Sequence, residues 1–102
     1  MRALKDVRVR EPPMGIEYLG EDLEIVRVKP RPGERGAWVD GTTNGYRFQA
    51  FVSADGRITR LWVWRQRDEV RVLGPGEVPA DEDAREVVEF LDANLALRML
   101  EG

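Results

Sequence analysis

The chain has 102 residues, 42% of them hydrophobic, a formal net charge of −3, and neither cysteine nor histidine. This size and apolar content indicate one domain over residues 1–102 that buries roughly two-thirds of the surface of the unfolded chain. The missing residue types exclude a disulfide framework, a thiolate nucleophile, an imidazole base and the usual zinc ligand sets, while the negative charge weighs against binding of long nucleic acid.

Residues 1–29 predict two strands. Strand-like runs at 7–10 and 23–28 are separated by the Pro- and Gly-containing residues 11–15, which predict a turn or loop. Charged residues interrupt the apolar core that a signal peptide requires, and no apolar stretch is as long as a membrane span. We therefore expect a cytoplasmic protein without membrane contact.

Residues 37–73 predict a β-meander of three to four antiparallel strands. Asn44-Gly45 and Asp55-Gly56 each interrupt strand-forming residues. Both dipeptides favour the type I′ turn of a two-residue hairpin loop, and such a tight turn sets the register of the strands that it joins.

This register divides the side chains of the meander between two faces of the sheet. Ala50 lies opposite Val39 on one neighbouring strand and opposite Leu61 on the other, so these three residues share a face. The first, which we call the core face, collects Val39, Tyr46, Phe48, Ala50, Val52, Leu61 and Val63. The second, which we call the aromatic face, collects Trp38, Asp40, Thr42, Arg47, Gln49, Phe51, Ile58, Arg60, Trp62 and Trp64. The clean separation supports the pairing, because a slip of one residue would exchange the faces.

A fourth strand is expected over residues 69–73. In a tight pairing Arg71 lies opposite Trp64 and Val72 joins the core face beside Val63. Trp64 would then lie between Arg47 and Arg71, an arrangement that suits cation–π contact.

The last predicted element is a helix over residues 81–100, for which Asp81 is a suitable N-cap. An apolar stripe at helical spacing is expected to pack on the core face; it consists of Ala84, Val87, Val88, Leu91, Leu95 and Met99. The fold class is therefore predicted as α+β, an antiparallel sheet that includes the N-terminal strands, with one C-terminal helix packed on one face.

A second apolar stripe lies on nearly the opposite side of this helix. It consists of Phe90, Ala93, Leu97 and Leu100. One sheet cannot bury both stripes, so the second predicts either contact with the N-terminal residues or a symmetric homodimer through paired helices.

The aromatic face has two interpretations. It is buried beneath the strands at residues 4–10 and 23–29, or it is a binding surface. The polar residues Asp40, Arg47 and Gln49 favour a binding surface, because a buried interior requires partners for each of them.

As a binding surface, the aromatic face suits two kinds of partner. Trp and Arg are enriched at protein-binding hot spots, and aromatic rings beside Arg also stack and pair with nucleotides or single-stranded nucleic acid. The acidic chain favours a protein partner. The candidate site residues are Trp38, Arg47, Gln49, Phe51, Arg60, Trp62, Trp64 and Arg71.

Other chemistry has little support in the sequence. Asp81, Glu82 and Asp83 are expected to cap a helix rather than to bind a metal, and Asp40 with Asp55 does not make a convincing acid–base pair, because Asp55 belongs to a turn. No glycine spacing matches a nucleotide-binding loop. We expect no catalytic residue, no metal and no cofactor.

The runs WVDGTTNGYRFQA at residues 38–50 and GRITRLWV at residues 56–63 carry a resemblance. They are similar to a WVxGTxxGYRFxA…GRISxL pattern in a small family of uncharacterised proteins from bacteria and their phages, although the link through residues 53–56 is shorter here. The resemblance implies a phage or mobile-element accessory protein and transfers no site residue. The sequence thus predicts a non-enzymatic module that modulates or inhibits a host protein; a nucleotide-sequestering protein and a structural subunit are the alternatives.

Overall fold

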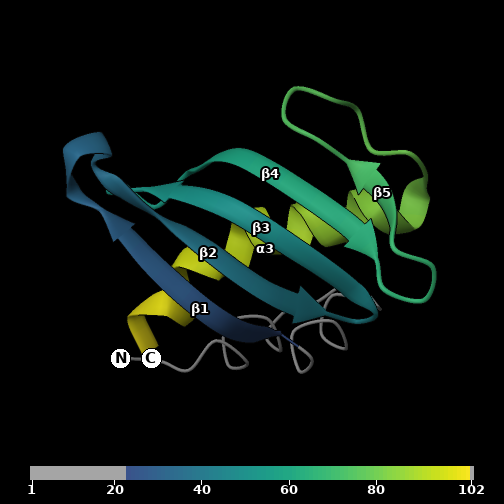
Figure 1. Cartoon of the computed structure of the whole chain (residues 1–102), viewed down its shortest axis with the longest axis horizontal. Coiled ribbons are helices and arrows are strands. Elements are labelled where there is room, and N and C mark those ends of the chain that lie inside the picture. Colours follow the sequence, from purple (N-terminus) through teal and green to yellow (C-terminus); the bar gives the residue numbers. More distant parts are fainter. Residues whose placement is uncertain (1–22, 102) are drawn as a thin grey trace.

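The computed structural model describes residues 23–101, which form a five-stranded sheet and one long helix. The elements are β1 (Glu24–Arg31), the 3-10 turn η1 (Pro32–Glu34), β2 (Gly36–Thr43), β3 (Tyr46–Ser53), β4 (Ile58–Arg65), β5 (Val70–Leu73) and α3 (Glu82–Glu101). All neighbouring strands are antiparallel, in the order β1-β2-β3-β4-β5, and α3 crosses one face of the sheet (Figure 1). This arrangement confirms the predicted α+β fold.

The first hairpin of the meander has the predicted turn. Asn44 and Gly45 both have positive φ, 47° and 84°, as a type I′ turn requires. Val39 consequently pairs with Ala50, as expected from the sequence.

The second hairpin differs from the prediction in its turn. Of the Asp55-Gly56 pair only Gly56 has positive φ, and the carbonyl of Ser53 accepts a hydrogen bond from the Gly56 amide (2.9 Å). Ser53 also donates its amide to the carbonyl of Arg57 (2.8 Å), so the loop has three residues with the glycine in the left-handed position. The predicted type I′ turn at Asp55-Gly56 is therefore wrong.

A β-bulge at Thr59 cancels the change in loop length. Phe51 still pairs with Arg60, but Val52 pairs with Ile58, one residue earlier than a regular ladder would place it. Ile58 therefore packs against the core and does not belong to the aromatic face. Because the longer loop and the bulge offset each other, most of the predicted register is correct although the predicted turn is not.

The expected fourth strand is β5, shifted by a second irregularity. Trp64 pairs with Arg71 as predicted, whereas Val63 pairs with Leu73 rather than with Val72. Val72 and Leu73 are both buried in the core.

The strand β1 lies at the edge of the sheet and pairs with β2. Because residues 24–31 extend the sheet, they do not lie across either of its faces. The interpretation in which the segment 23–29 covers the aromatic face is therefore wrong. The other predicted strand, at residues 4–10, lies outside the described residues.

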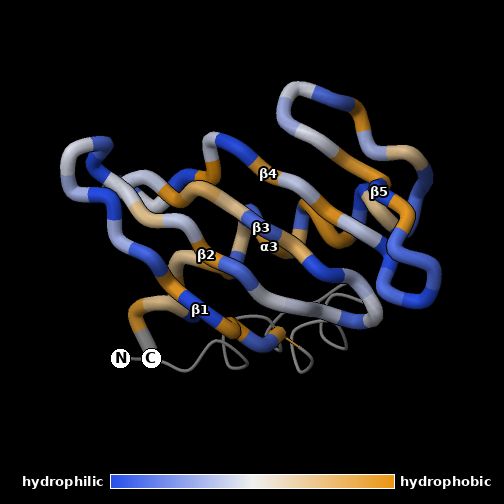
Figure 2. The backbone as a smooth tube through the Cα atoms, in the orientation of Figure 1, coloured by the Kyte–Doolittle hydropathy of each residue, from blue (hydrophilic) through white to orange (hydrophobic). Residues whose placement is uncertain are grey.

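The core fills the space between the core face and α3. Along the strands hydrophobic and hydrophilic residues alternate (Figure 2), as expected when successive side chains lie on opposite faces of the sheet. The buried members of the core are Leu23, Val39, Tyr46, Phe48, Ala50, Val52, Leu61, Val63, Val72, Leu73, Ala84, Val87, Phe90, Leu91 and Leu95. No helix in residues 23–101 combines the length and apolarity needed to cross a bilayer.

The second apolar stripe of α3 is divided between the core and the surface. Phe90 is completely buried in the core, and Leu97 is half-buried against it. Ala93 and Leu100 are exposed, Leu100 by 74%. Phe90 therefore has no surface to offer a second copy, which corrects its assignment to an oligomer interface.

Candidate functional site

The aromatic face is the side of the sheet turned away from α3, seen toward the viewer in Figure 1. Trp38 on β2 lies opposite Phe51 on β3, and Trp62 on β4 lies opposite Gln49 on β3. Trp64 lies between Arg47 on β3 and Arg71 on β5. Strand pairing thus gathers the sequence-predicted site residues on one surface.

Two tryptophans from strands that are not neighbours meet above β3. The strands β2 and β4 are about 10 Å apart, because each lies one strand spacing from β3. The ring centroids of Trp38 and Trp62 are nevertheless 6.0 Å apart, with the planes inclined at 36°. The two indoles therefore lean toward each other diagonally across β3, where Phe51 pairs with Trp38 and Gln49 pairs with Trp62.

Phe51 completes this cluster at its edge. Its ring centroid lies 5.2 Å from that of Trp38, and the two planes are inclined at 76°. Such an edge-to-face contact brings the positive edge of one ring to the negative face of the other. Phe51 is only 3% exposed, so it anchors the cluster rather than presenting a surface.

Gly36 makes the burial of Phe51 possible. A Cβ atom at Gly36 would lie 2.5 Å from the Phe51 ring and 2.6 Å from the carbonyl oxygen of Val52, closer than atoms can approach. Gly36 is not among the residues predicted from the sequence; its signal there is a glycine in a strand position two residues before Trp38, which often marks a close approach of another group to the backbone.

Two arginines stack on the aromatic rings. The guanidinium carbon of Arg47 lies 4.0 Å from the ring centroid of Trp64. That of Arg60 lies 5.2 Å from Trp38 and 4.8 Å from Phe51. Each contact is worth about 0.5–1 kcal/mol at an exposed site, and each restrains a ring. The predicted cation–π contact of Trp64 is thus present with Arg47.

Each of four arginines on the aromatic face also pairs with one carboxylate. The pairs are Arg27–Asp40 (3.2 Å), Arg60–Glu34 (3.2 Å), Arg71–Glu77 (3.4 Å) and Arg47–Glu69 (3.6 Å). Arg71, which lies opposite Trp64, is directed to Glu77 by this pairing. The strand pattern in the sequence does not predict these acidic partners, because three of them come from connecting segments rather than from the strands.

Exposure distinguishes the aromatic face from the core face. All three tryptophans are half-buried, and no element of residues 23–101 packs over them. A group of large rings and guanidinium groups that keeps part of its surface in solvent is typical of an interaction site.

A polar cleft of about 700 Å³ lies where the first hairpin turn meets the start of α3. Burial and the nearby Asp81 and Asp83 raise the pKa of the Tyr46 phenol. Arg65 and Arg67 share the cleft with Asp83 and Glu86. These opposite charges give the cleft no preference for an anion or a cation.

The acidic residues considered for catalysis or metal binding have structural roles. Asp55 accepts a hydrogen bond from the Ser53 hydroxyl, which lowers the pKa of Asp55. Asp40 pairs with Arg27. Within residues 23–101 no group of acidic side chains converges closely enough to hold a metal ion.

No protein-family model, curated protein or solved structure matches this chain. The resemblance to the bacterial and phage family stays a prediction.

Proposed function

We propose that the protein is a non-enzymatic binding module that contacts a protein partner through the aromatic face. The observation that carries this proposal is the cluster of half-buried Trp38, Trp62 and Trp64 on the side of the sheet opposite α3, with arginines stacked on the rings. Trp and Arg are the residues that most often dominate protein interfaces.

The geometry supports binding at low entropic cost. Edge-to-face and cation–π contacts already restrain Trp38, Trp64 and Arg60 in the free protein. Ordering a flexible side chain at an interface costs about 0.5–1.5 kcal/mol, so a surface that is ordered in advance retains more of its contact energy.

A protein partner fits this surface better than a nucleotide or single-stranded nucleic acid does. Arg47 and Arg60 cover ring faces on which a base would stack. A role as a cytoplasmic phage or mobile-element accessory protein that inhibits a host protein extends the proposal and rests on the sequence resemblance.

The proposal is tested by affinity purification from a bacterial lysate with the wild-type protein, Trp62→Ala and Leu100→Ala. Leu100→Ala is the matched control, since it removes an exposed apolar side chain from α3 rather than from the sheet. A stoichiometric partner should be retained by wild type and by the control and lost with Trp62→Ala, with circular dichroism showing that all three are folded. Equal retention by Trp62→Ala would contradict the proposal.

Nucleotide binding is tested separately through the intrinsic tryptophan fluorescence. We expect no change on addition of nucleotides or a short oligothymidylate at millimolar concentration. Quenching that salt and Arg60→Ala both weaken would instead support the nucleotide alternative.

A further inference from the structure

Charges of opposite sign are segregated on the two sides of the molecule. The strand positions on the aromatic face carry the basic residues Arg27, Lys29, Arg31, Arg47, Arg60 and Arg71, against the acidic Glu24 and Asp40. The exposed side of α3 carries the acidic Glu82, Asp83, Glu86, Glu89 and Asp92, against the basic Arg85. The strands themselves therefore present a positive surface within a chain whose net charge is negative.

Loop residues partly neutralise this positive surface. Glu34 belongs to η1, Glu69 to the β4–β5 connection and Glu77 to the segment between β5 and α3. Their carboxylates pair with Arg60, Arg47 and Arg71 respectively. Acidic side chains thus reach the aromatic face from three separate connections.

The ion pairs of Glu34 and Glu69 are easily exchanged, whereas the Glu77 carboxylate also accepts a hydrogen bond from the Gly74 amide (2.7 Å). The side chains of Arg60 and Glu34 are 47% and 51% exposed, and those of Arg47 and Glu69 are 44% and 72% exposed. Exposed pairs of this kind contribute about 0–1 kcal/mol each, because water solvates the separated charges nearly as well. An incoming carboxylate can therefore replace a loop carboxylate at little cost.

We infer that the aromatic face binds an acidic peptide segment that also carries an aromatic or aliphatic side chain, and that Glu34, Glu69 and Glu77 occupy the positions taken by its carboxylates. This inference rests on the proposed function. The apolar side chain of the segment packs on Trp38 and Trp62, while its acidic side chains pair with Arg47, Arg60 and Arg71. The loop carboxylates compete with the segment and weaken its binding.

The observations favour an acidic peptide over a nucleic acid. A carboxylate can replace Glu34 or Glu69 one for one, in the same geometry toward the guanidinium group. A nucleic acid would bring a continuous row of phosphates against a surface that still contains Asp40, and its bases would have to displace Arg47 and Arg60 from the rings.

The test begins with an unbiased library of displayed random dodecapeptides, from which the peptides that bind the wild-type protein are selected. Every peptide that also binds Trp62→Ala is then removed. We expect the remaining peptides to be rich in Asp and Glu around an aromatic or aliphatic residue. Peptides that are basic or uncharged would overturn this inference and leave the proposed function intact. Absence of any peptide that depends on Trp62 would also overturn this inference, whereas the proposed function fails only if Trp62→Ala retains the same partner as wild type in the affinity purification.

The role of the loop carboxylates is tested with the tightest selected peptide. The variant Glu34→Gln/Glu69→Gln/Glu77→Gln should bind it about three- to tenfold more tightly than wild type. The matched control Glu82→Gln/Glu86→Gln/Glu89→Gln makes the same change in net charge on α3 and should alter the affinity much less. Equal effects of the two variants, a short oligothymidylate that binds more tightly than the peptide, or self-association of the wild-type protein through this face would each overturn the inference.

Discussion

Two glycines of β2 accept aromatic rings, one on each face of the sheet. On the aromatic face the Phe51 ring lies against Gly36, and on the core face the Phe48 ring lies against Gly41. A side chain at either glycine would collide with the ring, so the missing Cβ atoms let both rings approach the strand closely. Rings in this position cover the backbone that glycine leaves bare.

Gly36→Ala should lower the free energy of unfolding by about 1–3 kcal/mol, because the new methyl group overlaps the Phe51 ring and the Val52 carbonyl. Gly33→Ala is the matched control, since nothing lies within 4 Å of its Cβ position. Urea denaturation followed by circular dichroism measures both effects. Equal stability of the two variants would show that Phe51 moves aside without cost.

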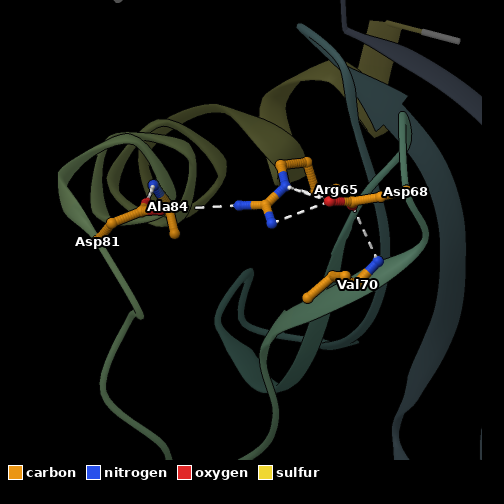
Figure 3. A network of polar contacts seen from close by, with 5 residues as sticks. All are labelled: Arg65, Asp68, Val70, Asp81 and Ala84. Atoms are coloured by element: carbon orange, nitrogen blue, oxygen red, sulfur yellow. Dashed lines mark hydrogen bonds and ion pairs between the residues drawn. The ribbon is translucent and has the colours of Figure 1, made fainter.

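At the scale of elements, an arginine near each end of α3 links the helix to the rest of the fold. Arg65, at the end of β4, lies between Asp68 and the N-cap residue Asp81, whose carboxylate accepts a hydrogen bond from the Ala84 amide (2.8 Å; Figure 3). The guanidinium group of Arg65 holds the pKa of Asp68 below its usual range. Near the other end, Arg98 donates a hydrogen bond to the carbonyl of Leu23 (2.7 Å).

Asp81→Ala should destabilise the protein by about 1 kcal/mol, because the Ala84 amide loses its acceptor at the start of α3. Asp81→Asn keeps an oxygen acceptor and removes only the charge that faces Arg65 at 4.0 Å, so it should cost less. Thermal unfolding of both variants distinguishes the two contributions. An equal loss for Asp81→Asn and Asp81→Ala would mean that the ion pair with Arg65, not the cap, stabilises the start of the helix.

At the scale of the whole molecule, a single layer of apolar side chains joins α3 to the core face. Phe90 lies at the border of the helical surface that faces the sheet and is nevertheless completely buried. Leu100, assigned from the sequence to the same stripe, is 74% exposed. Helical spacing alone therefore does not separate core residues from surface residues along α3.

Phe90→Ala should lower the free energy of unfolding by about 3–5 kcal/mol, the usual cost of emptying a buried phenylalanine site. Leu100→Ala should change it by no more than about 0.5 kcal/mol. Chemical denaturation of the two variants measures the difference, and light scattering reports their mass. A loss of mass with Leu100→Ala would support the predicted homodimer, whereas a larger loss of stability than with Phe90→Ala would contradict the placement of both residues.

Most of the sheet and the candidate site could be predicted from local chemistry. Asn44-Gly45 favours two successive residues with positive φ, and that geometry determines which side chains of β2 and β3 share a face. Asp55-Gly56 was misinterpreted because one dipeptide is compatible with loops of two and three residues. The side of the sheet that Ile58 occupies depends on the bulge at Thr59, for which the sequence has no clear signal.

The sequence by itself determined the β-meander, the C-terminal helix and the presence of Trp38, Trp62 and Trp64 on one face. Turn residues and a period of two act between near neighbours in the chain and need no other information. Only the tertiary structure decided that Phe90 is buried, that β1 extends the sheet rather than covering it, and that Glu34 pairs with Arg60. These features depend on contacts between residues far apart in the chain, whose meeting is set by the packing of all the elements together.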